Sequence, residues 1–67
     1  MKQLKTREEI LADFNRHGVT LSGWARVHNV PRQIVFDLLH GRAKGRHGMA
    51  HKAAVLLGLK DGVFIED

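Results

Sequence analysis

Apolar residues recur along the chain at the three- and four-residue spacing of a helical face, and the first such segment predicts a helix over residues 7–17. Thr6 and Glu9 form a capping-box pair at its start, in which the hydroxyl and the carboxylate each bond the other residue's backbone N–H. Gly18 stands where a left-handed C-terminal cap is expected. The apolar face of this helix comprises Ile10, Leu11 and Phe14.

Two further helices are expected to follow, joined by a tight turn. Thr20 can cap the first of them, and Asn29 is among the few residues other than glycine that tolerate the positive φ of such a turn. Pro31 suits the first turn of the next helix, which extends to about His40 and ends at Gly41. The inward positions are Leu21, Trp24, Ala25 and His28 in one helix and Ile34, Val35, Leu38 and Leu39 in the other.

A glycine-rich basic stretch over residues 42–48 has too few apolar residues for a core element and is expected to be an exposed, flexible loop. A fourth helix follows, Gly58 caps it, and Leu59 folds back on its last turn. Its helix-forming positions are Met49, Ala50, Ala53, Ala54, Leu56 and Leu57. The apolar tail residues Val63, Phe64 and Ile65 either dock on the core or offer an edge to a partner.

The segment from Leu21 to Gly41 contains small, apolar and turn residues in the order that two steeply crossing helices require. Ala25 allows the close crossing, and Val30 fills the space beneath the turn. Val35 fixes the second helix against its neighbours. The residues left facing outward are Arg32, Gln33, Phe36, Asp37 and His40.

The length of 67 residues is enough for one domain with a small core, built without any disulfide because the chain has no cysteine. We expect this all-α domain to span residues 1–67, with a flexible N-terminus over 1–5 and a tail over 61–67. No apolar stretch approaches the roughly 20 residues that span a bilayer, and no signal-peptide pattern opens the chain. The expected location is therefore the cytoplasm.

The distribution of charge says more than the formal net charge of +4. Residues 16–52 contain seven basic residues against Asp37 as the one acidic residue, a local net of +6. Such a segment can bind a polyanion, because cations near phosphates release condensed counterions. A solvated basic surface is the alternative interpretation.

The spacing of the Leu21 to Gly41 segment resembles the helix-turn-helix of the phage lambda-repressor-like family. The order of a leading helix, this motif, a basic loop and a closing helix that ends Leu57-Gly58-Leu59 is similar to the small Ner-like regulators of Mu-like phages and to short phage-associated proteins of the BcepMu type. Two positions depart from the family pattern: Asn29 stands where glycine is usual, and Trp24 is larger than the usual aliphatic residue.

The resemblance implies a four-helix DNA-binding fold, with a fifth helix as an alternative, in which the start of the second motif helix enters the major groove. Base contacts would then come from Arg32, Gln33, Phe36 and Asp37. Phosphate contacts would come from Thr20, Ser22, Arg42, Lys44, Arg46 and His47.

The chemistry of these side chains fits base recognition, with alternatives left open. Arg32 can donate to guanine O6 and N7, whereas Gln33 can pair with adenine or bind a phosphate. Phe36 either touches a thymine methyl or belongs to the core. Asp37 either accepts from cytosine N4 or orients a neighbouring arginine. Thr20 is either a helix cap without a ligand or a cap that also contacts phosphate.

Metal binding and catalysis are disfavoured by the residues present. His47 and His51 are one helical turn apart, but a structural zinc site normally needs four ligands, and thiolates are absent. No phosphate-binding glycine loop, cysteine nucleophile or serine with an evident base is present. Trp24 is interpreted as a core anchor. We therefore expect a protein that is not an enzyme and needs no cofactor or metal.

The function expected from these observations is sequence-specific binding of double-stranded DNA by a phage or prophage transcriptional regulator. A small helical protein-interaction module and a nonspecific nucleic-acid-binding protein are the alternatives. No membrane partner is expected. The chain would bind as a monomer or as a weak homodimer formed on DNA, with half-sites about 34 Å apart.

Overall fold

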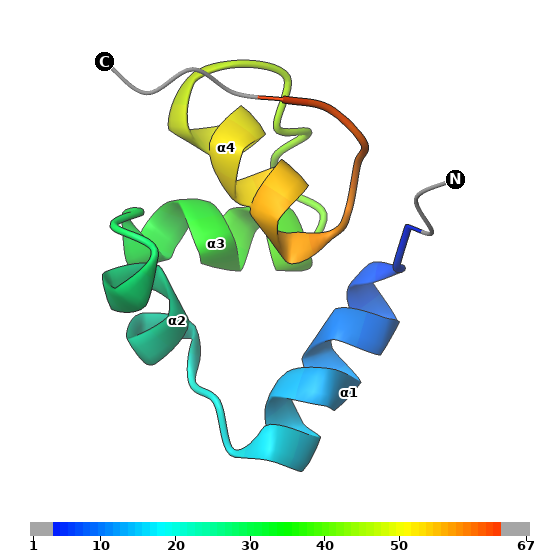
Figure 1. Ribbon diagram of the computed structural model, residues 1–67, viewed down its shortest axis with the longest axis vertical. Coiled ribbons are helices and arrows are strands. Elements are labelled where there is room, and N and C mark those ends of the chain that lie inside the picture. Colours follow the sequence, from blue (N-terminus) through cyan, green and yellow to red (C-terminus); the bar gives the residue numbers. More distant parts are fainter. Residues whose placement is uncertain (1–3, 64–67) are drawn as a thin grey trace.

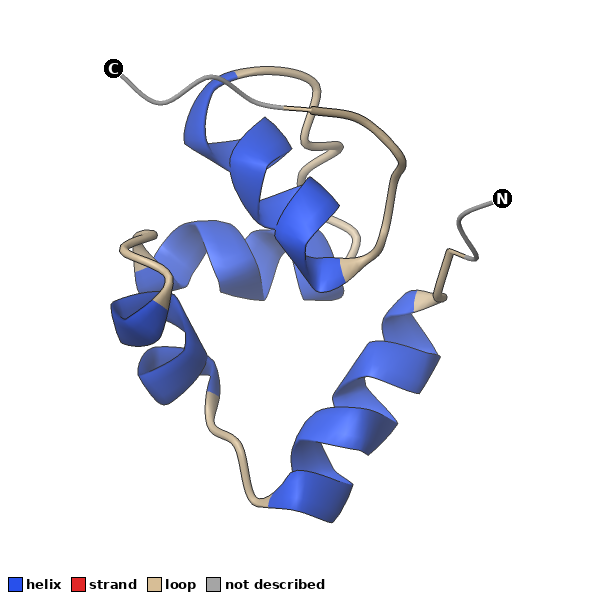
Figure 2. Ribbon diagram, in the orientation of Figure 1, coloured by secondary structure: helices blue, strands red, loops and turns tan. Residues whose placement is uncertain are grey.

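The computed structural model describes residues 4–63, which form four helices and no strand (Figures 1 and 2). The helices are α1 (Arg7–His17), α2 (Leu21–Val27), α3 (Arg32–Leu39) and α4 (Gly48–Leu57). This confirms the expected all-α class and the number of helices. Within the described residues, no helix has both the length and the apolar content needed to cross a bilayer.

The start of α1 is set by the predicted capping box. The Glu9 N–H donates to Thr6 Oγ1 at 3.1 Å, and the Thr6 N–H donates to Glu9 Oε1 at 2.8 Å. Gly18 ends the helix with a φ of 67°, in the left-handed region. Both boundaries of α1 therefore follow from local side-chain chemistry, as the sequence indicated.

Lys5, expected in a flexible N-terminus, is bonded through both its backbone and its side chain. Its N–H donates to the Gly58 carbonyl at 2.9 Å, and its Nζ donates to Asp13 Oδ2 at 3.0 Å. Arg16 pairs with the other carboxylate oxygen at 2.7 Å. The hydrogen bond from Lys5, with the charges of Lys5, Arg16 and His17, lowers the pKa of Asp13.

The connection between α2 and α3 has the predicted positive φ, 56° at Asn29. The Val30 N–H donates to the Ala25 carbonyl at 2.9 Å, and both side chains are buried. Pro31 lies directly before α3 rather than inside its first turn, and its carbonyl accepts from the Val35 N–H. Ala25 at the helix crossing and Val30 beneath the turn thus lie where the sequence predicted them.

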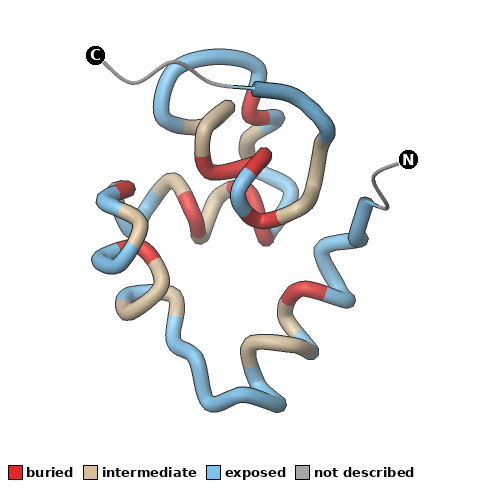
Figure 3. Tube along the Cα trace, in the orientation of Figure 1, coloured by how far each residue is buried: buried red, intermediate tan, exposed pale blue. Residues whose placement is uncertain are grey.

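The core is centred on α3, which contacts each of the other helices. Figure 3 shows buried segments along α3 and α4, with shorter ones in α1 and α2. Trp24 packs against this core while remaining half-buried, and stacks on His28 with ring centroids 4.0 Å apart. The core cluster comprises Ile10, Ala25, Val30, Val35, Leu38, Leu39, Ala53, Ala54 and Leu57.

The interpretation of residues 42–48 as wholly exposed is wrong at Gly45, which is buried. Lys60 reaches over this residue and donates from Nζ to its carbonyl at 3.1 Å. Leu59 folds back as expected, because its N–H donates to the Ala54 carbonyl at 2.9 Å. The chain after α4 therefore covers the connection before it.

The buried residues of α4 are not the same as the apolar positions from which this helix was predicted. Met49 and Leu56 are each 38% exposed, whereas Val55 is 8% exposed. Gly62 passes close to Val55, since a Cβ built on this glycine would lie 3.6 Å from the valine methyl. The C-terminal segment thus covers a side chain that helical periodicity alone did not mark as buried. Phe64 and Ile65 of the tail lie outside the described residues.

Candidate functional site

The first two residues of α3 face away from the interior. Arg32 and Gln33 are exposed, whereas Val35 and Leu38 on the same helix are fully or almost fully buried. A helix advances about 100° per residue, so one face of α3 packs on the core while the other remains open. The outward placement expected for Arg32 and Gln33 is confirmed.

Gln33 and Asp37 form a side-chain pair one helical turn apart. Gln33 Nε2 donates to Asp37 Oδ1 at 3.0 Å. The Asp37 backbone carbonyl accepts from the N–H groups of Arg42 and Ala43. Within residues 4–63, the Asp37 carboxylate makes no bond to an arginine side chain. Asp37 therefore pairs with a glutamine rather than with an arginine.

Phe36 contributes an aromatic cluster to the same face. Its ring stacks on His40 with centroids 4.1 Å apart and an interplanar angle of 21°, and Arg42 Cζ lies 5.7 Å from its centroid. Phe36 is half-buried but is not among the side chains that pack against the core cluster. The alternative that Phe36 belongs to the core is therefore wrong. His40 is held in turn, because Nδ1 lies 2.9 Å from the Phe36 carbonyl.

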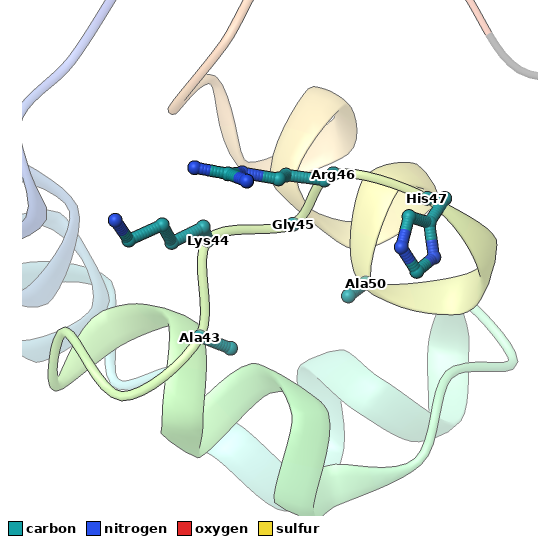
Figure 4. A pocket seen from close by; sticks show the side chains of 6 residues that line it. All are labelled: Ala43, Lys44, Gly45, Arg46, His47 and Ala50. Atoms are coloured by element: carbon teal, nitrogen blue, oxygen red, sulfur yellow. The ribbon is translucent and has the colours of Figure 1, made fainter.

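The connection between α3 and α4 carries a group of exposed cations. Figure 4 shows Lys44 and Arg46 extending to the same side, while His47 lies at the start of α4. Together with Ala43, Gly45 and Ala50, these residues line an open hollow of about 400 Å³. Within residues 4–63, no ion pair involves Arg32, Arg42, Lys44 or Arg46.

The two hydroxyl residues near the start of α2 differ in their surroundings. Thr20 Oγ1 accepts from the Gly23 N–H at 2.9 Å, so the capping role is confirmed. Ser22 is exposed and makes no side-chain hydrogen bond to the described part of the chain. In the view of Figure 1, the start of α2 lies below α3 and the connection to α4 runs above it, so α3 lies between the two expected sets of phosphate contacts.

Some of the contacts around this face were not anticipated. Arg7 on α1 donates from Nε to the Leu38 carbonyl at 3.1 Å, and the Gly41 N–H donates to the same oxygen at the end of α3. His17 and His28 place Nδ1 against the carbonyl four residues earlier, as His40 does. A histidine near the end of a predicted helix was the available signal for these contacts.

The described residues contain no group of three or more side chains suited to holding a metal. His51 is already engaged, because its Nε2 lies 2.6 Å from the Val63 carbonyl. The His47 and His51 pair suggested by their spacing therefore does not present two free imidazoles on one side.

The face of α3 and the adjoining cations thus offer hydrogen-bond donors and acceptors, the stacked rings of Phe36 and His40, and positive charge that has no acidic partner among the described residues. A surface of this composition suits a ligand that combines negative charge with flat, polar edges. A comparison with known protein families finds no match, and neither a curated protein nor a solved structure is significantly similar to this chain.

Proposed function

We propose that this protein binds double-stranded DNA in a sequence-specific manner, with α3 as the recognition helix of a lambda-repressor-like helix-turn-helix. The observation that carries the proposal is the open face of α3, which begins with exposed Arg32 and Gln33 and adjoins cations that have no acidic partner within residues 4–63. The expected role is that of a phage or prophage transcriptional regulator that occludes or recruits other machinery at its site.

The dimensions of α3 suit the major groove. The groove is about 12 Å wide, enough to admit a helix with its side chains, and the eight residues of α3 span about 12 Å along the helix axis. Arg32 stands at the first position, where a guanidinium can donate to guanine O6 and N7. Phe36 would offer a thymine methyl the part of its ring that the stacked His40 leaves open.

Phosphate contacts would fix the helix in register on both sides of the groove. Arg42, Lys44 and Arg46 can serve one strand, and the start of α2 can serve the other. Thr20 can take both roles considered for it, because a hydroxyl that accepts from the Gly23 N–H still has its own proton to donate. His47, exposed beside these cations, is a further donor.

A protein-interaction module is the second candidate, and the exposed apolar side chains favour it. Val27 is 78% exposed and Val63 is 85% exposed. Ionic strength separates the two functions, because DNA affinity falls steeply with salt whereas an apolar interface is nearly indifferent to it. Binding of equal strength to every duplex would instead indicate a nonspecific nucleic-acid-binding protein.

The test is a titration of labelled duplexes, using a site obtained by selection from a randomised pool. Arg32→Ala should weaken binding to the selected site about 5- to 150-fold, as expected for loss of one bidentate base contact. Arg26→Ala is the matched control, since it removes the same charge from an exposed position on α2. The proposal fails if wild type binds all duplexes alike. It also fails if Arg26→Ala reduces the preference for the selected site as much as Arg32→Ala does.

A further inference from the structure

Building on the proposed function, we infer that Asp37 positions the Gln33 amide to read an adenine in the recognised site, and that Asp37 itself makes no base contact. The observation is the hydrogen bond of 3.0 Å from Gln33 Nε2 to Asp37 Oδ1 on the open face of α3. Asp37 is thus a positioning residue that acts through Gln33.

The chemistry of the pair fixes which way the amide points. An ionised carboxylate has acceptor oxygens only, whereas a glutamine amide has an acceptor on Oε1 and two donors on Nε2. The opposite orientation would bring two acceptors together, one of them negatively charged. The nitrogen of Gln33 therefore faces Asp37, and Oε1 is directed elsewhere.

The groups of Gln33 that remain unshared select among the bases. Asp37 uses one hydrogen of Nε2, which leaves Oε1 and the second hydrogen available to DNA. In the major groove, adenine offers a donor at N6 and an acceptor at N7, so it satisfies both groups. Guanine offers two acceptors at O6 and N7, and its O6 would oppose Oε1. Cytosine and thymine each offer one hydrogen-bonding group.

The same pairing accounts for a carboxylate in the most basic part of the chain. Asp37 is the one acidic residue in the sequence between positions 16 and 52, and its charge opposes phosphate binding. Fixing the Gln33 side chain before DNA arrives reduces the conformational entropy lost on binding. Asp37 thus lowers the affinity for DNA of every sequence but strengthens the preference for adenine at one base pair.

The experiment uses wild type, Gln33→Ala, Asp37→Ala and the double variant with the selected duplex. Each adenine of the selected duplex is replaced in turn. The base that Gln33 reads is the adenine whose replacement weakens binding by wild type but not by Gln33→Ala. Duplexes then carry 7-deazaadenine, which lacks N7, or unsubstituted purine, which lacks the N6 amino group, at that position. Asp61→Ala is the control for charge, because it removes a carboxylate from an exposed position outside α3.

Wild type should bind both analogue duplexes about 5- to 150-fold more weakly than the adenine duplex. Asp37→Ala should reduce this ratio, the affinity for the adenine duplex divided by that for an analogue duplex, about 2- to 12-fold. That is the range expected for losing the pre-ordering of one long side chain. In the Gln33→Ala background, Asp37→Ala should leave the ratio unchanged and strengthen binding to all duplexes alike. Asp61→Ala should leave the ratio unchanged.

Three results would overturn the inference while leaving the proposed function intact. The first two are selective binding in which no adenine depends on Gln33, and an adenine preference that Asp37→Ala does not alter. An effect of Asp37→Ala on cytosine preference in the Gln33→Ala background would show that Asp37 reads a base directly, which also overturns it. Failure of wild type to bind any duplex selectively would remove the proposed function, and this inference with it.

Discussion

Gly45 is a buried residue of the connection between α3 and α4 and lies against α4. A Cβ at this position would lie 2.8 Å from the Ala54 Cβ and 2.9 Å from the Ala50 carbonyl oxygen. Its φ of 66° is in the left-handed region, which residues with a side chain rarely adopt. The glycine thus allows the basic connection to lie against α4.

Gly45→Ala should destabilise the protein by about 2–4 kcal/mol, combining the cost of a left-handed alanine with that of overpacking. Gly18→Ala is the control, since Gly18 has almost the same φ and no atom within 4 Å of the added methyl. Urea unfolding of both variants separates the backbone cost from the steric cost. Equal losses in the two variants would show that the contact at Gly45 is not tight.

Individual residues were predictable from the sequence where local chemistry decides their conformation. The positive φ of Asn29 and the cap at Thr20 needed only the chain neighbours. The pairing of Gln33 with Asp37 has a visible signal, the spacing of one helical turn, yet guanidinium and cytosine partners were considered for Asp37 instead. The burial of Gly45 had no local signal, because Lys60 and α4 create it.

At the scale of elements, α2 depends strongly on its cap. It has seven residues and contains Gly23, which costs about 1 kcal/mol relative to alanine in a helix. Thr20 satisfies the Gly23 N–H at the start of this helix. A helix so short gains little from propagation, so its packing on α3 and its cap have to hold it in place.

Thr20→Ala should cost about 1 kcal/mol of stability, within a range of about 0.5–2 kcal/mol for loss of an N-cap. Ser22→Ala is the comparison, because Ser22 is exposed and should leave stability nearly unchanged. Thermal unfolding followed by circular dichroism measures both. A larger loss for Ser22→Ala than for Thr20→Ala would contradict the assignment of the cap.

The bounds of elements were easier to predict than their buried faces. Capping signals placed α1 correctly, because its ends depend on Thr6, Glu9 and Gly18 alone. The buried face of α4 was not predicted, since the burial of Val55 depends on a segment that returns after Gly58. Helical periodicity predicts which residues are buried when a helix packs on the core through one face. In α4, the segment after Gly58 covers a second face as well.

At the scale of the whole molecule, the packing of three helices around α3 determines which surface is available. The core is built largely of alanine, valine and leucine, as suits a chain of 67 residues. The side of α3 that these helices leave open carries Arg32 and Gln33 at its start and Phe36 farther along, whose ring centroid lies 5.7 Å from Arg42 Cζ of the connection to α4. The position of this surface follows from the fold, whereas the proposal for its ligand rests on the chemistry of its side chains.

The most direct test of this account is an amide chemical-shift map of the protein titrated with the selected duplex and with a scrambled duplex of equal length. Recognition through α3 predicts shifts specific to the selected duplex at Arg32, Gln33 and Phe36, and shifts common to both duplexes over residues 42–47. Shifts confined to the exposed apolar residues Val27 and Val63, with the amides of α3 unchanged, would contradict it.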